Sequence, residues 1–475
     1  MLRQSESGHL SAIPSVAAGD SRPWQLRRAT ALSTALVLLT TGGLALVLPA
    51  HGHFLADEAR LYDGAVQIAQ TGRLAPFGPQ VSGTNPPLVL PGGAAFDLLA
   101  VPFLFGTDPW LGSLWVLLLA GAGLLVFDRA LLRLEVPTKT RLFAVAMFGF
   151  SIWHARFADR LWNYHPFQLV SPILLWIAAG LRKRPDSIGL ALALGAVSGI
   201  ALQLNPTGIL VITIACALAF EPAGRRPVRV LAIAGLGGVL VYLPYLVADA
   251  PHGFAVARAL FGDRAGRPAF GRAAGRSLLV FPAFASQSNG SSPERAHGLL
   301  APALSFWAAI PLTLFGLCLP SPLRRVCWLA LVLVPASFLL SGRDFYPHYV
   351  VSLLPLYFIP TATALAYTWN RGRLGAGLAS AYLATFVILG LVLLNREYLR
   401  PPARPTIAAQ LAVTDALLAL TRPVHWVDRA ESDAPIIYET LARRYRGKDL
   451  TLTGPGQDAW LAQPPLASSL VVRDK

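Results

Sequence analysis

The chain has 475 residues, of which 54% are hydrophobic and only 14% are charged. A soluble protein of this length needs more polar surface to cover its core, so the composition excludes an ordinary globular enzyme and indicates a polytopic membrane protein. The formal net charge of +15 would suit a nucleic-acid ligand, but the placement of the basic residues explains it otherwise.

The apolar runs predict about eleven membrane spans. Residues 1–29 are mostly polar and form a predicted cytoplasmic tail. The first run has no small-residue cleavage site and is expected to remain as an anchor. Runs close to the length that crosses a bilayer lie near 30–49, 109–127, 141–153, 166–181, 187–204, 207–220, 229–248, 300–320, 326–341, 349–368 and 375–394.

The basic residues orient these spans, because cytoplasmic loops are enriched in Lys and Arg. With the N-terminus inside, every short inner connection is basic, for example 129–141, 182–184 and 225–229. The Ala, Arg, Gly and Pro bias is typical of a high-GC bacterium. We therefore predict a multi-pass protein of the bacterial cytoplasmic (inner) membrane, with its C-terminus outside and lipids, not nucleic acid, around it.

Three sizeable segments then face outward: 50–108, 249–299 and 395–475. Within the first, the Pro- and Gly-rich stretch 86–105 predicts a helix that lies on or dips into the interface, because broken backbone is poorly tolerated in lipid. The last segment predicts a small extracytoplasmic α/β domain, with strands near 424–428, 450–453 and 469–473 and helices near 434–445 and 457–463. Residues 30–394 form the predicted transmembrane body.

Asp57 and Glu58 follow the first span directly and begin a predicted helix that Gly72 ends. Two adjacent carboxylates at a membrane edge are costly to place there without a role. A helix N-cap with an acid that offsets the helix dipole is the structural alternative. The pair is the main candidate for chemistry at the outer face.

Several motifs together carry a family resemblance. They are the Asp57-Glu58 pair, the tail Ala59–Tyr62, the turn Thr71–Leu74, the entry Pro86–Leu88, and the outer loops Ala155–Asn163 and Ser341–Tyr349. In order and side they resemble the protein O-mannosyltransferase and aminoarabinose (lipid A) transferase group. These are polytopic glycosyltransferases of the GT-C fold, and the resemblance covers most of residues 30–395.

The resemblance implies transfer of a sugar, with inversion, from a polyprenyl-phosphate donor to an acceptor hydroxyl or amine at the extracytoplasmic face. The acceptor is a glycan, a lipid or a protein. Attack on the sugar needs a carboxylate that takes the acceptor's proton. Asp57 is the predicted general base, and Glu58 shares that role or orients the acceptor.

The predicted substrate-binding residues lie on the outer loops. Cations near the leaving phosphate stabilise its charge, and Arg160, Arg343 and His348 are the candidates; headgroup anchoring is the alternative for the two arginines. Asp159 would position an arginine or the acceptor. Asn85 stands where the aminoarabinose-transferase branch has Lys, which implies that another cation contacts the phosphate, that the donor is held differently, or that activity is lost. The set also includes Arg60, Asn163 and Tyr346.

Two other functions and one cofactor stay open at this point. A transporter or flippase would place ionisable residues at mid-membrane and show related halves, whereas here they gather at span ends on one side. A non-catalytic membrane scaffold is the third interpretation. No cofactor is expected to be required, although His51, His53 and the two acids would suit a divalent metal.

Overall fold

The computed structural model describes residues 23–81, 88–221, 227–256, 258, 276–287, 300–341, 347–399, 406–420, 424–425, 434–450, 452–453, 460–461 and 472–473. The described chain is a bundle of helices with three short two-stranded sheets. The all-α fold class predicted from the sequence is confirmed.

A helix of the bundle overlaps each predicted apolar run, in whole or in part. These helices are α1 (Pro23–Ala45), α5 (Pro109–Arg133), α6 (Thr138–Gly149), α8 (Phe167–Lys183), α9 (Ile188–Leu204), α10 (Gly208–Phe220), α11 (Pro227–Asp249), α15 (Leu300–Cys318), α16 (Arg324–Ser341), α18 (Ile359–Trp369) and α19 (Arg373–Leu394). Within the described residues, four helical stretches are long and apolar enough to cross a membrane: Pro109–Arg133, Val228–His252, Pro347–Trp369 and Arg373–Leu399. The predicted number of crossings therefore stays a prediction.

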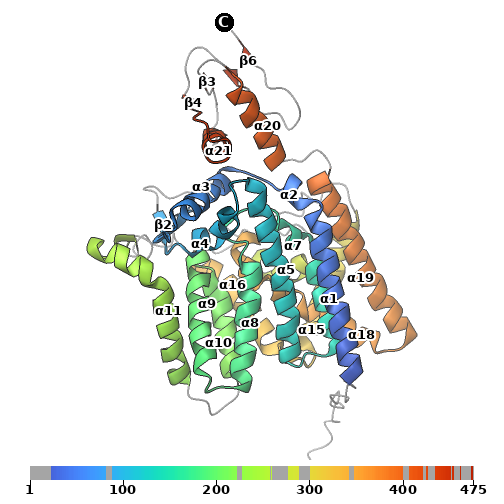
Figure 1. Ribbon diagram of the computed structural model, residues 1–475. Coiled ribbons are helices and arrows are strands. Elements are labelled where there is room, and N and C mark those ends of the chain that lie inside the picture. Colours follow the sequence, from blue (N-terminus) through green and yellow to red (C-terminus); the bar gives the residue numbers. More distant parts are fainter. Residues whose placement is uncertain are drawn as a thin grey trace, which may run out of the picture.

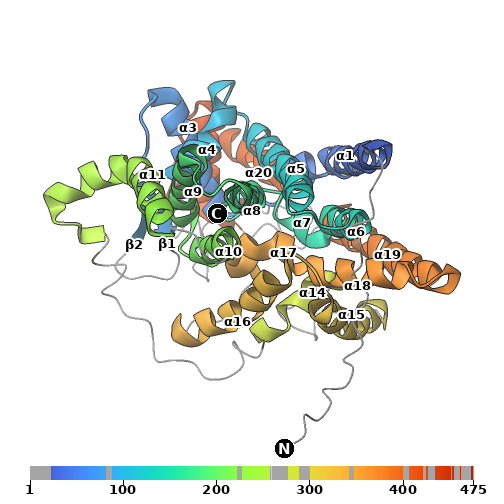
Figure 2. The ribbon, with the colours of Figure 1, turned by 90° about the horizontal axis from the view of Figure 1, so that it is seen from below.

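The outside of the bundle is apolar. Figure 2 shows α1, α11 and α19 at the periphery and α8 near the centre. Large apolar side chains such as Leu38, Leu240 and Leu391 are exposed on the outer helices, whereas Leu174 and Leu175 of α8 are buried. Extensive exposed apolar surface marks a membrane-contacting face, so the chain is an integral membrane protein.

Short elements cover one end of the bundle, away from α1's N-terminus (Figure 1). They include α2 (Leu48–His51), α3 (Ala56–Thr71), β1 (Phe77–Val81), β2 (Leu88–Pro91), α4 (Ala94–Ala100) and η1 (Val101–Leu104). Other short elements are α7 (Ile152–Arg156), η2 (Ala250–His252) and α14 (Val280–Ala285), whereas η4 (Pro347–Leu353) and α17 (Leu354–Tyr357) lead into α18 within one helical stretch. Ser151 interrupts the predicted 141–153 span, since its Oγ caps α7 by accepting from Trp153 N.

The helix predicted over 86–105 is wrong in its first part. β1 and β2 form an antiparallel hairpin, and the helix begins only at Ala94. The turn between β2 and α4 needs glycine: Gly92 has a φ of +92°, and a Cβ on Gly93 would lie 1.9 Å from the Ala75 carbonyl oxygen. The backbone therefore changes direction at these two glycines, and the strand ends there.

The C-terminal elements follow α19, and two helices among them share an apolar core with α3. They are the π-helical turn η5 (Asn395–Leu399), α20 (Ile407–Leu418), β3 (Val424–His425), α21 (Ala434–Leu441), the π-helical turn η6 (Ala442–Arg446), β4 (Leu452–Thr453), β5 (Trp460–Leu461) and β6 (Val472–Arg473). β3 pairs with β4 in parallel and β5 with β6 antiparallel. The helix predicted near 457–463 is wrong, because β5 occupies its centre and pairs with β6.

A second apolar core joins these elements to α3. Tyr62 of α3, Phe103 of η1, Leu411 of α20, and Tyr438 and Leu441 of α21 are all buried in it. The helix that carries Asp57 and Glu58 is thus held between the bundle and the C-terminal elements.

Candidate active site

The two adjacent acids at the start of α3 have different surroundings. Glu58 is 2% exposed, and its Oε2 accepts a hydrogen bond from the Leu55 N–H at 3.0 Å. The Asp57 side chain is 42% exposed and pairs with Arg60 at 3.1 Å. Successive helical residues point about 100° apart, so one acid faces the protein interior and the other faces outward.

Glu58 belongs to a buried chain of charges. Its Oε1 lies 3.3 Å from Arg160 Nη1, and Arg160 Nε lies 3.3 Å from Asp159 Oδ1. The Arg160 side chain is 13% exposed and both carboxylates are buried. Two carboxylates thus engage one guanidinium, which supports burial of all three charges because each has an opposite partner.

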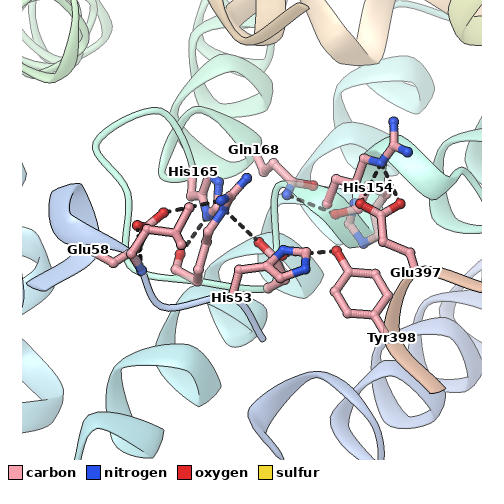
Figure 3. A network of polar contacts seen from close by, with 11 residues as sticks. His53, Glu58, His154, His165, Gln168, Glu397 and Tyr398 are labelled. Atoms are coloured by element: carbon pink, nitrogen blue, oxygen red, sulfur yellow. Dashed lines mark hydrogen bonds and ion pairs between the residues drawn. The ribbon is translucent and has the colours of Figure 1, made fainter. Parts of the chain in front are cut away.

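Asp159 connects this chain to two further segments. Its Oδ2 lies 3.1 Å from His53 Nδ1 and accepts a hydrogen bond from the Tyr398 hydroxyl at 2.9 Å. The His53 and Tyr398 rings also pack together, with centroids 5.5 Å apart. Figure 3 shows His53, from the segment that leads into α3, Glu58, from the start of α3, and Tyr398, from η5, converging on the site. Asp159 is therefore the point where the first outer loop, the 157–166 loop and η5 meet.

Burial and charge act oppositely on the two acids. Burial raises the pKa of Glu58, and Arg160 only partly offsets this. Burial alone would also raise the pKa of Asp159, but Arg160 and His53 outweigh it, so the pKa of Asp159 is lowered. Asp159 is thus the firmly ionised partner of Arg160 at neutral pH.

The Arg160 backbone and side chain are both fixed. His165 Nδ1 lies 2.5 Å from the Arg160 carbonyl oxygen and must donate, since a carbonyl only accepts. Burial lowers the pKa of His165 to about 3, so the ring is neutral at ordinary pH. The guanidinium also lies over the Trp162 ring, 5.2 Å from its centroid.

Aromatic rings extend from Trp162 toward η4. His348 lies 4.9 Å, centroid to centroid, from both Trp162 and Tyr164 and 4.4 Å from Tyr349. Asn163, in contrast, is buried and donates from Nδ2 to the Leu204 carbonyl at 2.7 Å. Asn163 therefore ties the loop to the end of α9, whereas His348 lies among rings that adjoin Arg160.

The C-terminal elements hold the segment that leads into α3. Ile407 N donates to the Gly52 carbonyl at 3.0 Å, and Gln410 Nε2 donates to the Phe54 carbonyl at 3.2 Å. Gly52 is closely approached, since a Cβ there would lie 2.1 Å from the Asp159 carbonyl oxygen. Hydrogen bonds to the backbone carbonyls on both sides of His53 thus fix its position.

Further along α3, Asp63 Oδ1 pairs with Arg443 at 2.9 Å and with Arg444 at 2.6 Å. Both arginines belong to η6, which directly continues α21. The C-terminal elements therefore fasten α3 one turn beyond Glu58, in addition to the segment before it.

The predicted site residues that the structure describes lie at this end of the bundle. Asp57, Glu58, Asp159 and Arg160 come together, with Arg60 beside Asp57, while Asn163 and His348 lie nearby. Their predicted roles stay predictions. Asn85, Arg343 and Tyr346 lie outside the described residues.

Sequence reasoning missed two partners of Asp159, His53 and Tyr398, although it expected Asp159 to position an arginine. His53 was a candidate only for a metal, and Tyr398 had no sequence signal because it lies 239 positions from Asp159. His53 instead contacts Asp159. No group of three or more His, Cys, Asp or Glu suited to a metal ion occurs among the described residues.

Solved structures show where the same fold occurs. ArnT from Cupriavidus metallidurans bound to undecaprenyl phosphate is similar, with a TM-score of 0.56 and 14% identity over 93% of this chain and 86% of that chain. Its apo state gives a TM-score of 0.53 with the same identity and coverage. The Archaeoglobus fulgidus oligosaccharyltransferase complex with Zn and sulfate gives 0.50 and 11% over 88% of this chain and 61% of that chain.

No family model matches the sequence, and no curated protein matches it either. At these identities the likeness to the solved structures concerns the fold. The expected GT-C fold, shared with membrane glycosyltransferases, is confirmed over most of the chain.

Proposed function

We propose that the chain is a membrane glycosyltransferase that moves a sugar from a polyprenyl-phosphate donor to an acceptor at the extracytoplasmic face. The observation that carries the proposal is the pair of acids at the start of α3. One is exposed, and its neighbour is anchored in a buried charge cluster. The shared fold with ArnT, described bound to undecaprenyl phosphate, supports the donor class.

In the proposed reaction, an acceptor hydroxyl or amine attacks C1 of the sugar. Its proton passes to the Asp57 carboxylate, and the bond from C1 to the phosphate oxygen breaks with inversion at C1. The electron pair of that bond leaves on the polyprenyl phosphate. Asp57 suits the role of general base because its side chain is 42% exposed and reachable from outside.

Glu58 suits a positioning role better than a second base. One of its carboxylate oxygens accepts from Leu55 N, and the other pairs with Arg160. Neither oxygen is directed to an incoming acceptor, since both are engaged inside the protein. Glu58 holds the first turn of α3 and thereby sets where Asp57 stands.

The donor phosphate needs a cation whose charge is not already taken. Two carboxylates engage Arg160, so we assign it to positioning in preference to phosphate contact. Arg343, from the sequence, remains the proposed phosphate contact, with Asn85, Tyr346 and His348 near the donor. Arg60 lies beside Asp57 and would approach the reacting groups from the same turn.

We propose the bacterial cytoplasmic membrane as the location, with residues 1–29 inside, 30–394 as the catalytic body and 395–475 outside. The acceptor is a glycan, lipid or protein. No cofactor is required in this proposal, because the donor has a single phosphate and no diphosphate leaving group that a metal would have to neutralise.

The test is a transfer assay on purified protein in lipid, with radiolabelled polyprenyl-phosphate sugars and a membrane extract as acceptor. Asp57→Asn is compared with Asp415→Asn, which removes another exposed acid paired with an arginine, Arg446. Label transfer by wild type and by Asp415→Asn, lost in folded Asp57→Asn, is the expected result. Transfer retained by Asp57→Asn removes Asp57 as base. No transfer with any donor refutes the glycosyltransferase and favours the transporter or scaffold.

A further inference from the structure

We infer that Tyr398 is a positioning residue of this site: its hydroxyl fixes the Asp159 carboxylate, and through Arg160 it fixes Glu58 beside the proposed base. The inference rests on the proposed function for its catalytic consequence. Its structural part, that Tyr398 acts through Asp159, stands on contacts alone.

The first step is the burial of the Tyr398 hydroxyl. Tyr398 is fully buried, and its hydroxyl donates to Asp159 Oδ2 at 2.9 Å. A buried tyrosine hydroxyl needs a partner, and a hydrogen bond to a carboxylate is stronger than one between neutral groups. The Tyr398 hydroxyl therefore stabilises one defined atom of the site, Asp159 Oδ2.

The second step is the division of labour between the two Asp159 oxygens. Oδ2 accepts the hydrogen bond from the Tyr398 hydroxyl and lies 3.1 Å from His53 Nδ1, so two side chains fix its position. Oδ1 faces Arg160 Nε at 3.3 Å. With Oδ2 fixed, the carboxylate cannot rotate away from Arg160. Without the hydroxyl, His53 is the one contact that remains at Oδ2 among the residues that the structure describes.

The third step is that η5 itself is firmly placed. Both carboxylate oxygens of Glu397 accept a hydrogen bond from Arg156 Nε, at 2.7 and 3.0 Å. The Arg156 guanidinium also lies 4.9 Å from the Trp153 ring centroid. Neighbouring residues Glu397 and Tyr398 thus both contact the 151–166 region. A π-helical turn is a local departure from the α-helix that recurs at functional sites, and here it occurs where these contacts form.

The fourth step leads from Asp159 to the chemistry. Arg160, held by Asp159, pairs with Glu58 at 3.3 Å. Glu58 directly follows Asp57 in α3. Small displacements of a catalytic group cost activity steeply. Loss of the Tyr398 hydroxyl is therefore expected to lower turnover and leave donor binding intact.

The experiment uses Tyr398→Phe, which keeps the ring against His53 and removes only the hydroxyl. Tyr357→Phe is the matched control, because Tyr357 is also fully buried but its hydroxyl donates to the Val350 backbone carbonyl at 3.2 Å. Asp159→Asn and the double variant complete a double-mutant cycle. Melting temperatures in detergent and transfer kinetics are measured for the full-length protein.

We expect the melting-temperature losses of Tyr398→Phe and Asp159→Asn to be clearly non-additive. We also expect kcat to fall about tenfold in Tyr398→Phe, as for a lost hydrogen bond to a charged group, with KM for the donor unchanged and kcat normal in Tyr357→Phe. Additive losses overturn the inference, as does full kcat in Tyr398→Phe or an equal loss in Tyr357→Phe. If wild type transfers no sugar, the proposed function fails, while the melting cycle alone still decides whether Tyr398 acts through Asp159.

Discussion

Removing the charge of Glu58 is expected to lower stability more than activity, whereas removing the charge of Asp57 is expected to lower activity more than stability. Removing one partner of a buried ion pair costs about 3–5 kcal/mol. Glu58→Gln should sit near the lower end, at about 3 kcal/mol, because the amide oxygen still accepts from Leu55 N and Asp159 still faces Arg160. The Asp57–Arg60 pair has both side chains more than a third exposed, so Asp57→Asn should cost under about 1 kcal/mol.

Activity should follow the reverse order. Loss of a general base lowers the rate by about 10²- to 10⁴-fold, so folded Asp57→Asn should be nearly inactive although it unfolds much like wild type. Denaturant unfolding in detergent gives the stabilities, and sugar transfer gives the rates. The reasoning is refuted if Asp57→Asn is destabilised as much as Glu58→Gln, or if Glu58→Gln unfolds like wild type. Asp415→Asn should match wild type in both measurements.

The remaining predictions concern the groups around this pair. The pKa of His165 is about 3 in the folded protein and about 6.5 in the unfolded chain. Between pH 6.5 and pH 3 the unfolded chain binds this proton more readily, so the free energy of unfolding falls as the pH drops, by about 2 kcal/mol at pH 5. His165→Asn should therefore lose less melting temperature on acidification than wild type. Gly52→Ala should cost about 1–3 kcal/mol and lower transfer, because its Cβ meets the Asp159 carbonyl oxygen; unchanged melting would contradict this. Asp63→Lys should detach η6 from α3 through repulsion by Arg444, and faster limited proteolysis of the C-terminal elements than in Asp63→Asn would confirm it.

The helices of the bundle could be predicted from sequence because their signal is local. A run of apolar residues of bilayer length favours a helix whatever its neighbours are. The hairpin at 77–91 was missed because Pro and Gly mark a break without saying which structure replaces the helix. The helix expected near 457–463 failed for a related reason: the strand at Trp460–Leu461 depends on pairing with Val472–Arg473, a contact that local preference does not contain.

The candidate site could be predicted only in part. The Asp57-Glu58 pair and the Asp159-Arg160 pair each show as adjacent charges at a span end, and the structure brings them together. The different surroundings of Asp57 and Glu58 follow from the rotation of the helix, which needs its packing partners to be assigned. Tyr398 contacts Asp159 across 239 positions, and no spacing rule reaches that far.

The contacts across the site also set the order in which it is completed during synthesis. His53 and α3 belong to the first outer segment to be made, yet their partners Tyr398, Ile407 and Arg444 follow only after the last helix of the bundle. Until those residues have been translated, Asp159 lacks one of its anchors and α3 lacks its cover. A nascent chain halted before that point carries both acids of the pair but has an incomplete site, so the contacts of the site are all present only after the last helix of the bundle has been made.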